Sequence, residues 1–172
     1  RQESKMNRWD KQFLDLATVI AGWSRCHARQ IGAILVRDKT VIATGFNGPP
    51  RGIPHCEYRF KEGIDPQFYN LLLSEQIAGY TTRREKCPRR ALGAKPGEHQ
   101  LRNICPAAHA EENCIVNAAR SGTTTLDSIM YLSCEIPCAS CLRKIINAGI
   151  VEIVCISLTR YEPLSEFLLN HS

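Results

Sequence analysis

The central segment of the chain, residues 109–141, reads HAEENCIVNAARSGTTTLDSIMYLSCEIPCASC. One short motif opens it, His109-Ala110-Glu111, and another closes it, Pro137-Cys138-Ala139-Ser140-Cys141. Apolar residues at helical spacing predict a helix over residues 109–120 and a second helix over residues 138–148. Each motif therefore stands at the beginning of a helix.

The rest of the chain supplies the elements of a mixed sheet. Helical periodicity predicts an amphipathic helix over residues 9–24, and a turn at residues 37–39 joins two strands into a hairpin. The latter half alternates helix and strand, which implies right-handed parallel crossovers and helices that cover the sheet. The other expected elements are strands at 31–36, 41–46, 128–133 and 150–156, and helices near 66–78 and at 163–169. These elements predict an α/β fold with a central mixed sheet, in which an antiparallel hairpin is followed by parallel strands.

Composition favours one compact domain over residues 1–172. Hydrophobic residues make up 44% of the chain, enough to build a core. No apolar run approaches the roughly 18 residues that span a bilayer, and no signal peptide is recognised, so no membrane association is expected. The net charge of +5 favours anionic substrates such as nucleotides but lies below that of a dedicated nucleic-acid-binding protein. Nine cysteines without an export signal favour metal ligation over disulfides and indicate a cytoplasmic setting.

The two motifs together predict a zinc site. Cys138 and Cys141 are three residues apart, so on a first helical turn both thiols point to one side, where the positive end of the helix favours thiolate. His109 supplies a third ligand. Three protein ligands leave the fourth tetrahedral position open, which is typical of a catalytic zinc ion. Glu111 does not share the direction of His109 and is expected to move protons at the open position. A purely structural zinc site is the alternative, but it would leave Glu111 without a role.

The pair of motifs matches the His-x-Glu and Pro-Cys-x-x-Cys signature of zinc-dependent nucleobase deaminases. Over residues 9–165 the chain resembles the cytidine deaminase-like superfamily and, within it, the deoxycytidylate (dCMP) deaminases. Gly45-Phe46-Asn47-Gly48 is similar to the family's Gly-Tyr-Asn-Gly turn, with Phe46 in place of tyrosine, and residues 109–113 and 145–150 also resemble family segments. The resemblance implies a three-layer α/β/α fold, hydrolysis of dCMP to dUMP with release of ammonia, and a homohexamer regulated by dCTP and dTTP.

Three residues are candidates for binding the deoxynucleotide substrate. The resemblance implies that Asn47 contacts the sugar, although Asn-Gly is also a common turn pair. Arg51 is placed to bind the 5′-phosphate through a bidentate contact, with a solvated loop arginine as the alternative. Tyr161 falls where the family often carries a tyrosine near the rim of the site, and packing against the last helix is its alternative role.

A Cys-rich insertion at about residues 53–108 suggests a second, structural zinc ion. A polar segment of this length buries too little apolar surface to fold by itself. Soft ligands bound to a zinc ion would fix its conformation. Several phage and bacterial dCMP deaminases carry a second zinc on this side of the fold, so the resemblance points the same way. Scattered free cysteines are the alternative, since such residues are often simply small and buried. The candidate ligands are Cys26, Cys56, Cys87 and Cys105, with His27, His55 and His99 as replacements, whereas Cys114, Cys134 and Cys155 are expected in the core.

Other functions stay open on the sequence alone. A polynucleotide deaminase that acts on tRNA adenosine or on cytosine in single-stranded DNA needs a basic groove with aromatic stacking partners. Few aromatic residues accompany the basic cluster at residues 83–90, so a nucleic-acid partner is not expected. A zinc-stabilised regulatory protein with little activity is a second alternative, and deamination of a guanine or pterin base is a third. The cluster consists of Arg83, Arg84, Lys86, Arg89 and Arg90.

Overall fold

A computed structural model of the chain describes residues 6–61, 63–68, 70, 87–91, 93–95, 102–159 and 162–172. The chain divides into two compact units. Unit 1 contains residues 1–24, 31–47 and 109–172, and unit 2 contains residues 25–30 and 48–108. Both sequence motifs belong to unit 1. The description of the chain as one domain with an insertion at about 53–108 stays a prediction. Among the helices of the described residues, none has the length and apolar composition of a membrane span.

Unit 1 is built on a four-stranded sheet in the order β2-β1-β3-β4. The strands are β1 Gly32–Arg37, β2 Thr40–Phe46, β3 Ile129–Leu132 and β4 Glu152–Cys155. β1 pairs antiparallel with both β2 and β3, whereas β3 and β4 are parallel. The hairpin turn between β1 and β2 has positive φ at both Asp38 and Lys39, which suits the twist of the two strands. The predicted mixed sheet is confirmed.

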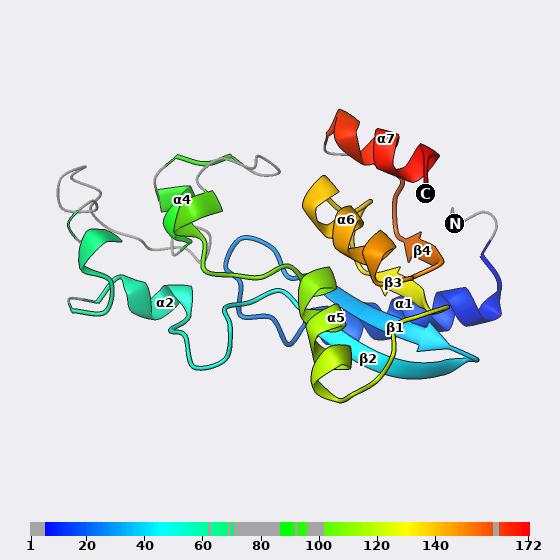
Figure 1. The fold of residues 1–172 in the computed structure, drawn as a ribbon. Helices are drawn as coiled ribbons and strands as arrows, with labels where there is room; N and C mark the ends of the chain where they lie inside the picture. Colours follow the sequence, from blue (N-terminus) through cyan, green and yellow to red (C-terminus); the bar gives the residue numbers. More distant parts are fainter. Residues whose placement is uncertain are drawn as a thin grey trace. The chain divides into compact units, whose positions relative to one another are not determined.

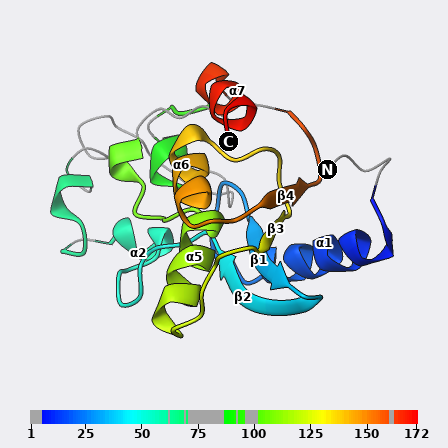
Figure 2. The ribbon, with the colours of Figure 1, turned by 45° about the vertical axis from the view of Figure 1, so that its right-hand side comes forward.

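Helices cover both faces of this sheet (Figures 1 and 2). α1 (Arg8–Ala21) lies on one face, and α5 (Ala110–Arg120) and α6 (Ala139–Asn147) lie on the other. Alternate strand residues point to opposite faces: Ile34 packs with α1 in one hydrophobic cluster, and Leu35 packs with α5 and α6 in another. α7 (Pro163–Asn170) packs on α6. Unit 1 therefore has the three-layer α/β/α architecture that the resemblance implied.

The ends of the predicted elements of unit 1 lie within three residues of the observed ends. α1 begins after Asn7, whose side chain accepts hydrogen bonds from the backbone of Trp9 and Asp10. α1 ends at Ala21 rather than at residue 24, because Gly22 takes the C-cap position. Of the helix expected near residues 66–78, residues 66–68 and 70 are helical and residues 71–78 lie outside the described residues.

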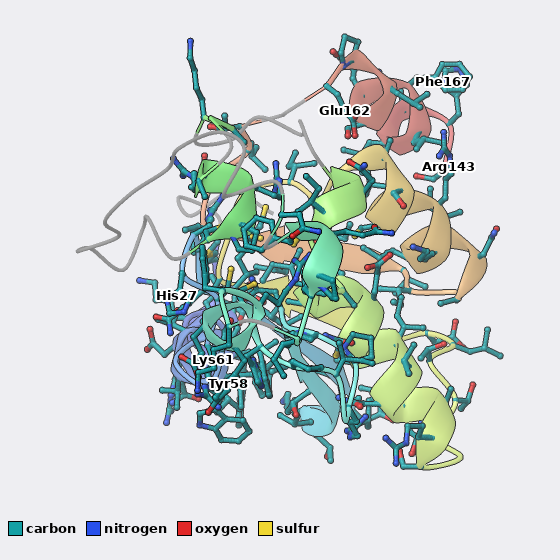
Figure 3. The ribbon with its side chains drawn as sticks, turned by 90° about the vertical axis from the view of Figure 1, so that its left-hand side faces the viewer. His27, Tyr58, Lys61, Arg143, Glu162 and Phe167 are labelled. Atoms are coloured by element: carbon teal, nitrogen blue, oxygen red, sulfur yellow. The ribbon has the colours of Figure 1, made fainter. Side chains whose placement is uncertain are left out.

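Unit 2 holds short helices and turns. The described helices include α2 (Cys56–Arg59), α4 (Pro88–Ala91) and the 3₁₀ helix η2 (Arg102–Ile104), besides the helical residues 66–68 and 70. The two ends of its longer segment, residues 48–108, meet through paired backbone hydrogen bonds between Gly48 and Ala108. Charged groups add local order: Arg59 pairs with Asp65, and the Lys61 ammonium lies 5.0 Å from the Tyr58 ring centre (Figure 3).

Gly45 lets β2 and α5 approach each other closely, and this contact supports a prediction. A Cβ atom at Gly45 would lie 2.3 Å from the Cys114 backbone nitrogen and 2.5 Å from the Ala110 carbonyl oxygen. Gly45→Ala should therefore push β2 from α5, lower the free energy of unfolding by about 3 kcal/mol and lower Tm by roughly 6–12 °C. Gly48→Ala is the control, because a Cβ there meets nothing within 4 Å. Equal melting temperatures for the two variants would contradict the close approach.

Candidate metal centre and active site

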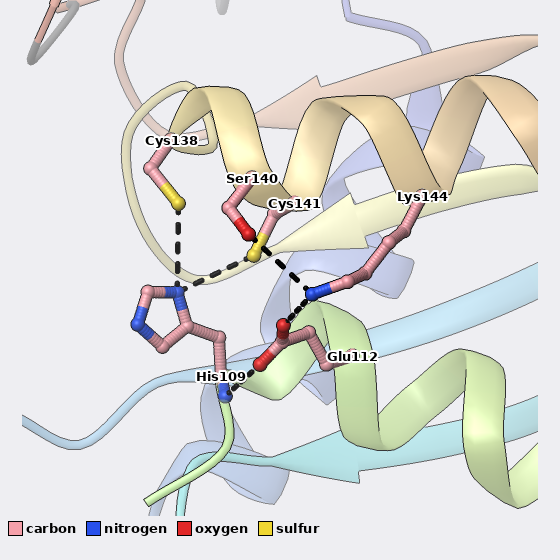
Figure 4. A network of polar contacts seen from close by, with 6 residues as sticks. All are labelled: His109, Glu112, Cys138, Ser140, Cys141 and Lys144. Carbon is pink, nitrogen blue, oxygen red and sulfur yellow. Dashed lines mark hydrogen bonds and ion pairs between the residues drawn. The ribbon is translucent and has the colours of Figure 1, made fainter. Parts of the chain in front are cut away.

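Three potential metal ligands meet where the N-termini of α5 and α6 come together (Figure 4). His109 is the N-cap of α5, Cys138 is the N-cap of α6, and Cys141 lies in the first turn of α6. The Nδ1 atom of His109 is 3.7 Å from Cys138 Sγ and 3.3 Å from Cys141 Sγ. Within the described part of the chain, this is the one group of three or more such residues whose ligand atoms all lie within 4.8 Å of one another.

These three side chains lie close enough to shift one another's pKa values. Hydrogen bonds from Cys141 and His109 outweigh burial and lower the pKa of the Cys138 thiol to about 3. The same contact with Cys138, together with burial, raises the pKa of Cys141, and contact with Cys138 also raises the pKa of His109. A dication can replace the protons on these ligand atoms. Two thiolates with one imidazole form a ligand set that zinc prefers. The residues present therefore fit a zinc ion.

Glu111 lies in the first turn of α5, next to this cluster in the sequence. Its side chain is buried, with only 4% of the residue exposed. Burial raises the pKa of the carboxyl group, and the charge on His109 opposes that rise. A buried carboxyl group with a raised pKa is suited to accept a proton and release it again within one reaction.

Two asparagines hold α5 against β2. Asn113 Nδ2 donates to the Phe46 carbonyl oxygen and Asn117 Nδ2 donates to the Thr44 carbonyl oxygen, both at 2.8 Å. These bonds fix the rotation of the helix that begins at His109. Sequence reasoning singled out Asn113 only as part of a family-like segment, because nothing in the sequence says which strand carbonyl it meets.

The C-terminal helix supports the other motif. Glu162, the N-cap of α7 (Figure 3), accepts a 2.6 Å hydrogen bond from the backbone N–H of Ala139 through Oε1. The buried hydroxyl of Ser165 donates to the Pro137 carbonyl oxygen at 3.2 Å. α7 therefore holds the loop that carries Cys138 in place through these two hydrogen bonds. Sequence analysis missed Glu162 and Ser165, because neither forms a recognisable motif with residues so far away in the chain.

Comparison with known proteins identifies the family. Residues 7–157 match the family model described as the cytidine and deoxycytidylate deaminase zinc-binding region. This chain belongs to that family. The curated deoxycytidylate deaminase of Mycobacterium phage D29 is 30% identical over 149 residues, which are 85% of this chain and 92% of that protein. The deoxycytidylate deaminase of Saccharomyces cerevisiae is 32% identical over 85% of this chain, but the match spans only 36% of the yeast protein.

A solved structure agrees with the fold of this deaminase family member. The dCMP deaminase from the cyanophage S-TIM5 in its apo form aligns with a TM-score of 0.59. The alignment covers 95% of this chain and 94% of the phage chain at 20% sequence identity. At that identity the likeness shows the α/β fold alone.

The three proposed substrate residues lie in different environments, and one of them lies outside the described residues. Asn47 is buried directly after β2, where its Oδ1 accepts a 2.8 Å hydrogen bond from Ile31 N–H. This amide thus fixes the start of β1. Arg51 is exposed at a turn of unit 2, and Tyr161 lies outside the described residues. The roles of all three in binding substrate stay predictions.

The second cysteine set belongs entirely to unit 2. Cys87 is buried, and Cys26, Cys56 and Cys105 are half-buried. Burial, together with the charges of the other three thiols, raises the pKa of Cys56 to about 12. These described cysteines do not form a group of three whose sulfur atoms all lie within 4.8 Å of one another. The second zinc site therefore stays a prediction.

The remaining candidate residues lie in the core, in unit 2 or outside the described residues. Cys114, Cys134 and Cys155 are buried, as expected for core residues. His55 is the N-cap of α2, and the His27 imidazole lies 3.7 Å from a Glu57 carboxylate oxygen. In the basic cluster, Arg89 and Arg90 lie on α4. His99, Arg83, Arg84 and Lys86 lie outside the described residues.

Proposed function

We propose that this protein hydrolyses dCMP to dUMP and releases ammonia, with one zinc ion bound by His109, Cys138 and Cys141. The observation that carries the proposal is the convergence of these three side chains at two helix N-termini. The buried Glu111 follows His109 by two residues in the sequence. The phage D29 protein, curated as a deoxycytidylate deaminase, matches this chain over 92% of its own length and supports the choice of substrate.

Each residue has a defined role in this proposal. A zinc ion held by His109, Cys138 and Cys141 would supply an activated water molecule for attack on the ring carbon that bears the amino group. Glu111 would accept a proton from that water and deliver it to the ring nitrogen. It would then take the second proton, from the hydroxyl group added to the ring carbon, and pass it to the amino group, which leaves as ammonia while the carbonyl group forms. His109, Cys138 and Cys141 would hold the metal, and a set of three protein ligands is typical of a catalytic rather than a structural zinc ion.

The substrate contacts rest on the family resemblance. Asn47 contacts the sugar, Arg51 binds the 5′-phosphate, and Tyr161 lies at the rim of the site. An arginine suits a phosphate because its planar guanidinium group donates two parallel hydrogen bonds. The net charge of +5 also favours a nucleotide over an uncharged nucleoside. We further expect a cytoplasmic homohexamer whose activity responds to dCTP and dTTP.

An ammonia-release assay over a panel of substrates tests the function. The panel contains dCMP, deoxycytidine, dCTP, guanine, single-stranded DNA with cytosine, and tRNA. We expect turnover of dCMP and a response of the rate to dCTP and dTTP. Turnover restricted to tRNA or DNA would replace the proposal with a polynucleotide deaminase. Zinc binding without turnover of any substrate would indicate a zinc-stabilised regulatory protein.

A second, structural zinc ion is proposed for unit 2, held by Cys26, Cys56, Cys87 and Cys105. The four residues lie within one compact unit, and the charge of each of the other three acts on the Cys56 thiol. Four soft ligands on one ion would hold this polar segment in a fixed conformation.

Metal counting tests this second ion directly. Elemental analysis of the purified protein is expected to give about two zinc ions per chain, and Cys56→Ser is expected to leave about one. The variant should also make unit 2 more sensitive to proteolysis, because metal binding and folding are coupled. Cys114→Ser, at a buried cysteine of α5, is the control and should keep both ions. A count of one for the unaltered protein would remove the second site.

A further inference from the structure

Glu112 connects the backbone of one proposed zinc ligand to its own helix. Its Oε2 atom accepts a 2.9 Å hydrogen bond from the backbone N–H of His109. Glu112 occupies the third position of α5 and so provides the carboxylate half of a capping box. The bond restrains the backbone from which the His109 imidazole projects.

The other oxygen of Glu112 reaches the second ligand-bearing helix. Oε1 forms an ion pair with the ammonium group of Lys144 on α6 (Figure 4). The same ammonium group lies 3.4 Å from the hydroxyl oxygen of Ser140, which stands between the two cysteine ligands. One carboxylate group therefore binds His109 on one side and, through Lys144, the turn of α6 that carries Cys138 and Cys141.

The exposure of this ion pair indicates that it adds little to the stability of the fold as a whole. Lys144 has 49% of its side chain exposed and Glu112 has 23%. Ion pairs with such exposure contribute little to the stability of a fold. A zinc site requires ligand distances within about 0.2 Å of their usual values, so a contact that adds little to fold stability can still matter for metal binding.

We propose that Glu112 and Lys144 are positioning residues that set the separation between His109 and the Cys138–Cys141 pair. This proposal rests on the proposed function only in placing zinc at these three ligands. Groups that orient metal ligands without touching the metal commonly change metal affinity by about 10–100-fold when they are removed. The pair would thereby raise the affinity of the protein for zinc by holding the three ligand atoms at their observed separation.

A double-mutant cycle tests the pair. The variants are Glu112→Gln, Lys144→Gln and the double substitution, and zinc affinity is measured by competition with a chromogenic chelator. Glutamine at position 112 still accepts the His109 hydrogen bond, so that variant removes the charge alone. Each single variant is expected to raise the zinc dissociation constant by about ten-fold, and the double variant is expected to be no weaker than either single variant.

A spectroscopic readout separates positioning from general stability. Cobalt(II) replaces zinc in the same protein, and its visible bands together with the thiolate-to-cobalt charge-transfer band report the ligand geometry. We expect altered bands in Lys144→Gln while the circular dichroism of the metal-free protein stays unchanged. Arg143→Gln is the matched control: Arg143 is exposed at the preceding position of α6 (Figure 3), and no ion pair joins it to another described residue.

The outcomes distinguish the two proposals. Zinc affinities and cobalt spectra that match the unaltered protein in both single variants would overturn the positioning role, and so would strictly additive effects in the double variant. Neither readout requires substrate, so tight zinc binding without turnover of dCMP would overturn the proposed function and leave the positioning role standing. An unaltered protein that binds no zinc at His109 would overturn both.

Discussion

Glu111→Gln is expected to lower kcat for the deamination of dCMP by about 10²–10⁴-fold, the usual contribution of general acid–base catalysis. The substitution keeps the size of the side chain, which matters because only 4% of this residue is exposed. The amide group of glutamine cannot accept and return a proton at neutral pH. Because Glu111 is not among the three clustered ligands, zinc should stay bound at this site in the variant.

The test measures metal content and steady-state rates on the same preparations. Glu166→Gln is the matched control, since Glu166 is an exposed glutamate on α7, and its kcat should equal that of the unaltered protein. Full activity in Glu111→Gln with zinc in place would remove the proton-transfer role. Loss of zinc together with activity would instead make Glu111 a part of the metal site.

The zinc ligands were predictable because their geometry is local. Cys138 and Cys141 share one helical turn, so their spacing alone brings the two thiols together. His109 precedes a helix in the same α/β alternation, and this pattern predicted that α5 and α6 would lie on the sheet. The hairpin followed from two apolar runs on either side of a polar turn, which the structure places at Asp38 and Lys39.

The contacts that support the site were not predictable in the same way. Glu162 and Ser165 meet the second motif through tertiary packing of α7 on α6, which no local pattern encodes. Lys144 meets Glu112 across 32 positions of sequence, although glutamate three residues after the N-cap His109 was a readable signal of a capped helix. Pairing of β1 with β3 likewise depends on the fold as a whole rather than on either strand.

Cys141→Ser is expected to remove zinc from the His109 site, to below about 0.1 ion per chain, because serine at neutral pH offers no soft, negatively charged ligand. Activity should then fall below about 1% of that of the unaltered protein, since the metal provides the reactive water. Cys141 is fully buried, and its sulfur lies 3.3 Å from His109 Nδ1.

Cys155→Ser separates loss of the metal from loss of a buried sulfur atom. Cys155 is buried in unit 1 almost as deeply as Cys141, but it lies in β4, and its thiol donates to the Ser157 carbonyl oxygen, a bond that a serine hydroxyl can also make. The control should therefore retain both zinc and activity. If Cys141→Ser kept its zinc and its rate, the metal would be held by other residues, and the convergence of His109, Cys138 and Cys141 would have no catalytic meaning.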